Sequence, residues 1–147
     1  LQTGSTARLR WLAAEALGKK DDPPTVAALG DALAKKQESW MVRAEAARAL
    51  GKIRSSAAFD QLAKNTKVDH PKVRRAVAGA LGNFKRPDAA RALAELARRD
   101  RSYLVGAEAA RALGRTRQPE GLKTLLEVID RPSWADVQRA GALDGLV

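Results

Sequence analysis

Few side chains in this sequence could carry acid–base or metal chemistry. The chain of 147 residues contains one histidine, His70, and no cysteine. A catalytic base needs an orienting partner and a nucleophile within hydrogen-bond reach, and the sequence around His70 offers neither. A zinc site with one histidine and no cysteine would need mostly carboxylate ligands. We therefore predict no catalytic residue, no metal site and no cofactor, and expect that these residues do not form an enzyme.

Basic side chains are the other candidates for function. The formal net charge is +10, and residues 52–114 hold 14 basic and 6 acidic residues, a net of +8. A concentrated positive charge attracts nucleic acid or an acidic protein face. The candidate interaction surface consists of six residues: Arg48, Lys52, Arg98, Arg99, Arg111 and Arg115.

Acidic neighbours favour a simpler interpretation of this surface. Glu45 precedes Arg48 by three residues, and Glu108 stands in the same relation to Arg111. Pairs of this kind stabilise an exposed helix by about 0.2–0.5 kcal/mol each. We therefore favour a solvated helix face, and keep nucleic-acid binding through the basic central segment as the alternative.

A repeated helical unit positions these side chains. Gly18, Gly51, Gly82 and Gly114 end the strings RWLAAEALG, VRAEAARALG, VRRAVAGALG and GAEAARALG. The last copy reads QRAGALDGLV, with Val147 where the others have glycine. These end points are separated by 33, 31, 32 and 33 residues, a period typical of stacked helix pairs.

Each copy contains an apolar stripe with helical spacing. In one copy the stripe runs i, i+4, i+7, i+8 and i+11 through Val42, Ala46, Ala49, Leu50 and Ile53. The alanines of the stripe let neighbouring helices approach each other. The glycine near the end of each stripe predicts a residue in the left-handed conformation that ends the helix. A second apolar segment precedes each stripe after the first one, with proline or serine at its start. Each period is therefore predicted to contain a first and a second helix.

Aromatic residues follow a serine at the start of three second helices. They are Trp40, Tyr103 and Trp134, and His70 fills the place in another copy. Serine is a good N-cap, so the ring belongs to the first helical turn. We expect these rings to cover the edge of the core. Contact with a peptide or with nucleic-acid bases is the alternative.

The pattern VRAEAARALGKI, with an acid just ahead of it, resembles the HEAT-like repeats first noted in phycobilisome lyases. The resemblance covers essentially the whole chain. It implies an all-α fold, an α-α superhelix or HEAT-like solenoid of about nine helices in roughly four and a half pairs. It also implies that second helices line the concave side. We expect residues 1–147 to form a single domain cut from a longer chain.

A narrower resemblance rests on the segments DDPPTVAALGDAL, SWMVRAEAARALGKI, HPKVRRAVAGALG and PSWADVQRAGALDGL. They are similar to the helical C-terminal region of bacterial gluzincin zinc aminopeptidases, the alanyl-aminopeptidase family. In that family the catalytic part lies upstream, with an H-E-x-x-H zinc helix and a G-x-M-E-N substrate loop. Neither motif occurs here, so no catalytic residue is carried over. The resemblance implies an accessory solenoid attached to a metallopeptidase.

The HEAT resemblance further implies a ladder of ion pairs between an acidic turn residue and an arginine of the same or the next repeat. Glu38 and Asp69 lie five residues before Arg43 and Arg74. A guanidinium group bridges carboxylates and loop carbonyls through several donors. We predict that these four residues form a structural ladder, with phosphate binding as the alternative. The repeat position of Arg43 and Arg74 is also occupied by arginine at Arg10 and Arg139 and by glycine at Gly106, so this arginine column has one break.

These patterns predict a non-catalytic scaffold that binds a protein or peptide through a preformed surface. The aminopeptidase resemblance implies that the partner is the catalytic domain of the same chain. Apolar stripes at the ends of the stack predict end-to-end self-association. No apolar run reaches membrane-spanning length, so no membrane partner is expected. A lyase-like chromophore partner is supported by the fold alone.

Overall fold

The computed structural model describes residues 2–147, with the side chains of residues 6–133 and 135–147. This part of the chain contains nine α-helices, one short 3-10 helix and no strand. The helices are α1 (Gln2–Leu17), α2 (Pro23–Ala34), α3 (Trp40–Ile53), α4 (Ser56–Lys64), α5 (Pro71–Leu81), α6 (Pro87–Arg99), α7 (Tyr103–Arg115), α8 (Glu120–Ile129), η1 (Trp134–Asp136) and α9 (Val137–Leu146). The prediction of an all-α superhelical solenoid is confirmed.

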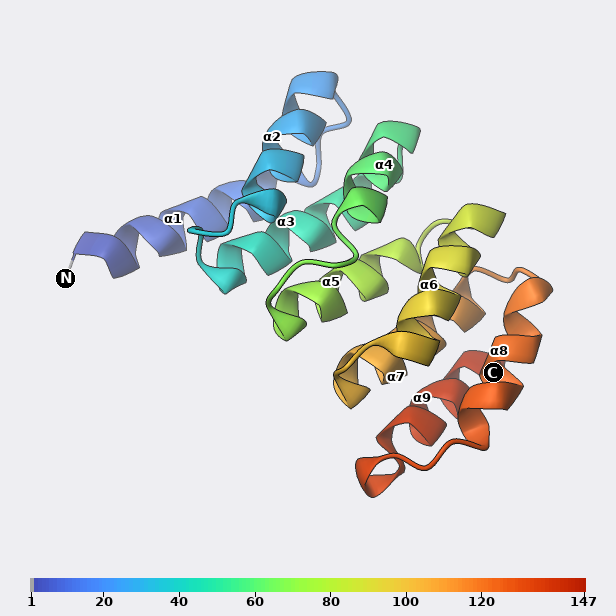
Figure 1. The fold of residues 1–147 in the computed structure, drawn as a ribbon. Helices are drawn as coiled ribbons and strands as arrows, with labels where there is room; N and C mark the ends of the chain where they lie inside the picture. Colours follow the sequence, from blue (N-terminus) through green and yellow to red (C-terminus); the bar gives the residue numbers. More distant parts are fainter. Residues whose placement is uncertain (1) are drawn as a thin grey trace.

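The helices form two layers (Figure 1). The second-helix layer consists of α1, α3, α5, α7 and α9, and each of these helices contacts the next. The first-helix layer consists of α2, α4, α6 and α8 and lies along one side of it. Neither layer can bury its apolar stripe alone, so stacking supplies a continuous core.

Short polar segments start the helices. The Asp22 carboxylate accepts a hydrogen bond from the Thr25 backbone N–H at 2.9 Å and caps α2. The Ser55 hydroxyl caps α4 in the same way, and His70 Nδ1 accepts from the Lys72 backbone N–H at 3.2 Å to cap α5. Because these groups satisfy backbone donors that a helix leaves unpaired, they fix where each helix begins.

Alanine and leucine fill the space between the layers. Burying one leucine side chain stabilises the folded state by about 1.5–3 kcal/mol. The leucines that are almost completely buried come from six consecutive helices, α2 to α7: Leu29, Leu33, Leu50, Leu62, Leu81, Leu93 and Leu113.

The repeat glycines serve a different purpose from the one predicted. In the described backbone no glycine has a positive φ, so the prediction of left-handed helix ends at these glycines is wrong. A Cβ added to Gly51 would lie 2.8 Å from the Ala80 Cβ, and one added to Gly82 would lie 2.9 Å from the Ala112 Cβ. Glycine is therefore required where one second helix crosses close to the next. Gly18 makes the equivalent approach to Ala49.

The two layers are not equally tight. Consecutive second helices contact each other more extensively than consecutive first helices do. Between α6 and α8 in the first-helix layer, long side chains such as Arg98 and Glu127 bridge the gap. A row of helices that lie closer together is the inner row of a curved stack. The second-helix layer is accordingly the concave side.

Apolar side chains are exposed at both ends of the stack. On α1, Leu9 is 65% exposed, whereas Val42 at the equivalent place on α3 is 2% exposed. At the other end, Leu122, Leu126 and Leu143 are exposed on α8 and α9. Among the described helices, none is long and apolar enough to span a lipid bilayer.

Candidate interaction face

Ion pairs link consecutive repeats along one edge of the stack. Arg43 Nη1 donates to Asp69 Oδ1 at 3.0 Å, and its Nε donates to the Leu33 carbonyl at 3.0 Å. Arg74 donates to both oxygens of Asp100, at 2.7 and 3.0 Å. Arg43 and Arg74 are 2% and 4% exposed, so both guanidinium groups are almost completely buried.

The four residues singled out in the sequence therefore lie on this edge, but they do not pair within one repeat. Glu38 accepts from Arg10 at 2.8 and 3.0 Å, and Asp69 accepts from Arg43, so each arginine reaches the acid of the following turn. Hydrogen bonding from Arg10 lowers the pKa of the Glu38 carboxyl, and Arg43 does the same for the pKa of Asp69.

Sequence reasoning missed Asp100, the partner of Arg74. Asp69 lies thirteen residues before Gly82, whereas Asp100 lies fourteen before Gly114, so a fixed spacing passes over it. The column then breaks at Gly106, where the Gln138 side chain from α9 occupies the space that a side chain at Gly106 would need.

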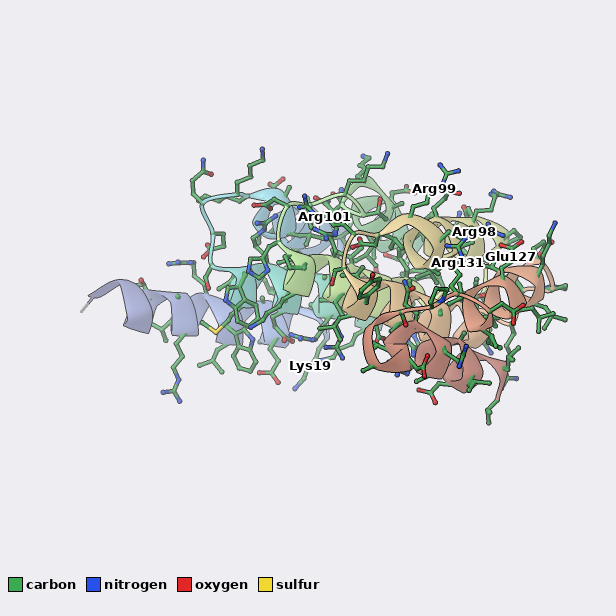
Figure 2. The ribbon with its side chains drawn as sticks, turned by 60° about the horizontal axis from the view of Figure 1, so that its bottom comes forward. Lys19, Arg98, Arg99, Arg101, Glu127 and Arg131 are labelled. Carbon is green, nitrogen blue, oxygen red and sulfur yellow. The ribbon has the colours of Figure 1, made fainter. Side chains whose placement is uncertain are left out.

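The six basic residues proposed as one surface fall on two faces. Arg48 and Lys52 on α3 and Arg111 and Arg115 near the end of α7 belong to the second-helix layer. Arg98 and Arg99 belong to α6 in the other layer. Figure 2 shows them on the side of the stack opposite to Lys19, which follows α1.

Most of these six side chains are already paired. Arg98 Nε donates to Glu127 at 2.8 Å, and Arg131 donates to the Arg98 carbonyl at 2.7 Å (Figure 2). Arg111 lies between Glu108 and Asp144 at 2.9 and 2.8 Å, an arrangement that raises the pKa of its guanidinium. The remaining pairs are Arg48 with Glu45, Arg99 with Glu95 and Arg115 with Glu108.

A groove of about 690 Å³ runs along the concave side over α5. Its walls are α3 and α7, and its floor is α5, because α5 carries small residues where its neighbours carry long ones. Gly79 stands at the place of Arg48 and Arg111, and Ala76 at the place of two glutamates. The lining residues are Trp40, Arg48, Lys52, Lys72, Arg75, Ala76, Gly79, Ala80, Asn83 and Glu108.

Positive charge dominates this groove. Among the described residues, Arg48, Lys52, Lys72 and Arg75 line it together with one carboxylate, that of Glu108. Among the described side chains, Lys52 and Arg75 have no ion-pair partner. The Glu108 carboxylate already accepts from Arg111 and Arg115. The groove therefore offers several cations to a ligand.

Trp40 closes one end of the groove. Its ring stacks on His70 with centroids 5.6 Å apart and planes 8° apart, and the Lys72 ammonium lies 4.3 Å from the ring centroid. Trp40 and Tyr103 are 37% and 49% exposed, so each ring offers a surface to solvent. The side chain of Trp134, the third member of this aromatic column, lies outside the described residues.

Comparison with known proteins identifies the architecture. The family model for HEAT repeats matches residues 1–71 and again residues 66–144. The chain belongs to the HEAT-repeat family. None of the curated proteins compared with this HEAT-repeat chain matches it.

Two solved structures share this HEAT-repeat arrangement. Human deoxyhypusine hydroxylase, solved in complex with glycerol, matches 86% of the chain with a TM-score of 0.74 and 26% sequence identity. The chain spans 43% of the length of that hydroxylase chain. The second is the complex of CpcE and CpcF of phycocyanin lyase from Nostoc sp. PCC7120, with a TM-score of 0.52 and 24% sequence identity. The match covers 95% of the present chain and 70% of the lyase chain.

The hydroxylase match corrects one expectation from the sequence. The prediction that these residues do not form an enzyme is contradicted. Deoxyhypusine hydroxylase, which is named as an enzyme, has this HEAT-repeat architecture and is 26% identical in sequence to the matched part of the chain. The prediction relied on the absence of local catalytic motifs, but function depends on sites that can be assembled on any fold. In the described part of the chain, no three His, Asp or Glu side chains converge as metal ligands.

Proposed function

We propose that the concave groove binds an acidic segment of a partner protein. The observation that carries this proposal is the groove over α5, in which four cations surround a single, already paired carboxylate. Complementary charge steers association and selects the partner. HEAT repeats present extended concave surfaces of this kind for binding.

The shape of the groove favours an extended segment over a folded domain. A volume of about 690 Å³ between two helices accommodates a few side chains of a peptide, whereas a globular partner would need a broader face. The walls are held by the helix stack before binding. Little ordering of the receptor is therefore needed when the segment docks.

Trp40 and the arginines supply contacts beyond charge. Tryptophan and arginine are enriched among the residues that dominate interface energies. Trp40, Arg48 and Arg75 all line the groove. Gly79 lies in its floor and has no side chain to fill the space between α3 and α7. Its carbonyl accepts a hydrogen bond from Arg115 Nη2 at 3.1 Å.

Nucleic-acid binding is the weaker candidate for this chain. It would depend on four basic residues of the central segment and its end: Arg98, Arg99, Arg111 and Arg115. Arg98 and Arg111 are held by acids of a neighbouring helix, and α6 lies in the other layer. A phosphate backbone would have to displace those acids before it could gain the same contacts.

Selection from phage-displayed random peptides tests the proposal. The wild-type chain is expected to enrich peptides that contain several aspartates or glutamates. A variant with Lys52→Glu, Lys72→Glu and Arg75→Glu should lose that enrichment. The matched control carries three charge reversals on exposed residues of the first-helix layer: Lys64→Glu, Arg91→Glu and Lys123→Glu.

Filling the groove provides a second, uncharged test. Gly79→Gln restores a long side chain at the place where α3 and α7 carry arginine, and it suits a helix better than glycine. We expect this variant to fold and to lose the acidic peptides. Enrichment without acidic bias, or equal enrichment by all variants, would contradict the proposal. Stronger competition by duplex DNA at low salt would favour the nucleic-acid alternative.

The aminopeptidase resemblance remains a prediction. It would place the acidic segment in the same polypeptide, on an upstream catalytic domain. The observation that tests it is the upstream reading frame, where an H-E-x-x-H helix is expected.

A further inference from the structure

Two smaller hollows adjoin the groove at opposite ends of the second helices. The first lies between α1 and α3, near the start of α3, and has a volume of about 480 Å³. Four of its six lining residues are apolar: Ala7, Trp11, Trp40 and Met41, together with Arg8 and Arg48. Met41 is 49% exposed, and both Trp40 and Arg48 also line the groove. We call this hollow the apolar pocket.

The second hollow lies at the other end of the helices, in the turns that follow α3, α5 and α7, and has a volume of about 420 Å³. Arg54, Lys85, Arg115 and Arg117 line it, and Asp144 is the one acidic residue among the described residues of its lining. Asp144 is already paired with Arg111. Asn83 lines both this hollow and the groove, so the two are continuous. We call it the basic pocket.

Three cations of the basic pocket occupy one repeat position. Arg54, Lys85 and Arg117 are each the third residue after a repeat glycine, and all three are exposed. No ion pair engages them among the described side chains. A cation near a helix C-terminus stabilises the helix dipole, which accounts for one basic residue in each turn. It does not account for three turns that direct their cations to one hollow.

The distance between the pockets limits what can occupy both. They lie at opposite ends of α3, whose 14 residues span roughly 21 Å at 1.5 Å per residue. The basic pocket is also displaced sideways by one or two helices, at about 10 Å each. An extended peptide covers about 3.3 Å per residue, so roughly six to nine residues separate the two points.

We propose that the bound segment is bipolar: one large apolar side chain enters the apolar pocket, and acidic residues roughly six to nine positions away enter the basic pocket. This proposal rests on the proposed function of the groove, which lies between the pockets and carries the intervening chain. The cations of the basic pocket complement the acidic end of the segment in charge. Trp11, Trp40 and Met41 offer apolar contacts to the large side chain at its other end.

Fluorescence anisotropy with synthetic peptides tests it. The reference probe carries fluorescein, one tryptophan, a spacer of about seven glycine and serine residues, and a run of glutamates, matching the extended spacing above. One companion probe replaces tryptophan with serine, another shortens the spacer to about two residues, and a third replaces the glutamates with glutamines. The protein variants are Met41→Gln for the apolar pocket, and Lys85→Gln with Arg117→Gln for the basic pocket.

Matched control variants are available in the same chain. Leu104→Gln changes an exposed apolar residue at the place on α7 equivalent to Met41 on α3, outside both pockets. Lys64→Gln with Arg91→Gln removes two exposed cations from the first-helix layer. Both controls should bind all four probes as the wild type does.

The wild type is expected to lose about tenfold in affinity when the probe tryptophan is replaced, a size typical of an anchoring residue. Met41→Gln should abolish that tryptophan dependence and keep the glutamate dependence, and the basic-pocket variant should do the reverse. Shortening the spacer should weaken binding to the wild type and to the two controls, but not to either pocket variant.

Two results would overturn the bipolar arrangement. One is a tryptophan dependence that is the same in the wild type and in Met41→Gln. The other is a wild-type affinity that is the same for the reference probe and for the probe with the short spacer. Either result, with glutamate dependence retained, would leave the groove proposal intact. Binding of no acidic probe at all would instead overturn the proposed function itself.

Discussion

Arg74 and Asp100 form the most enclosed ion pair among the described side chains. Arg74 Nε lies 2.7 Å from Asp100 Oδ2, and the two side chains are 5% and 4% exposed. Arg74 also donates to the Val68 and Asp69 carbonyls. The pair joins α5 to the turn before α7, so it connects successive repeats.

Asp100→Ala should destabilise the fold by about 3 kcal/mol, because it leaves the Arg74 charge buried without its carboxylate. Urea unfolding followed by circular dichroism measures this loss. Glu95→Ala is the control, since the pair of Glu95 with Arg99 is 3.6 Å long and exposed, and its loss should cost at most about 0.5 kcal/mol. Similar costs for the two variants would contradict the structural role of the Arg74–Asp100 pair.

Gly51→Ala should destabilise the fold by about 1–3 kcal/mol, because the added Cβ would overlap Ala80 on the next second helix. Gly79→Ala is the matched control. Its Cβ would lie 3.2 Å from the end of the flexible Glu108 side chain, and alanine favours a helix by about 0.5–1 kcal/mol over glycine. In thermal unfolding, the melting temperature should therefore fall for Gly51→Ala and rise for Gly79→Ala. Equal shifts would show that helix propensity, and not close approach, governs both positions.

Acid should weaken the ladder. Arginine partners lower the pKa values of Glu38 and Asp69 below their ordinary values of 4.5 and 3.8. A carboxyl whose pKa is lower in the folded state stabilises the fold fully above its unfolded pKa, and this stabilisation is lost as the pH falls through the folded pKa. The melting temperature should be nearly constant between about pH 6 and 8 and should fall below about pH 4.5.

Glu38→Gln tests the source of this acid sensitivity. The variant should melt lower than the wild type at neutral pH, and the difference should shrink as the pH falls below the ordinary Glu38 value of 4.5. A difference that is independent of pH would mean that the Glu38 charge contributes nothing to the ladder.

The exposed apolar residues at the two ends predict concentration-dependent self-association. Leu9 and Leu12 at one end and Leu122 and Leu126 at the other are 44–65% exposed. Apolar side chains exposed at the ends of a helix stack favour contact between copies. Sedimentation velocity should show a rising average mass as the concentration rises. Leu122→Glu with Leu126→Glu should abolish the rise, and persistence of association in that variant would place the contact elsewhere.

The sequence predicted the fold well because the fold depends on a local regularity. The apolar spacing through Val42, Ala46 and Leu50 recurs in each copy, and it determines which helix face is buried. The arginine column could also be read from spacing, since its members recur with the period. Asp100 could not, because a shift of one residue in a turn is invisible until the turn is folded.

The groove was not predicted from the sequence. Gly79 and Asn83 stand at the positions where α3 carries Arg48 and Lys52 and α7 carries Arg111 and Arg115. In the fold the same small residues lower the middle of the face and create the hollow. Likewise, Arg98 and Glu127 lie 29 residues apart, so their pairing between α6 and α8 has no local signal.

Unequal spacing of the two layers gives the stack a preferred direction of bending. Glycine–alanine crossings such as Gly51 with Ala80 leave the inner row no slack to compress. The outer row is joined by long side chains such as Arg98 and Glu127, which can lengthen or re-form at small cost. We therefore expect the solenoid to bend about the contacts between its second helices, with the spacing of its first helices changing. Small changes of the outer gaps would alter its curvature while the helices stay rigid.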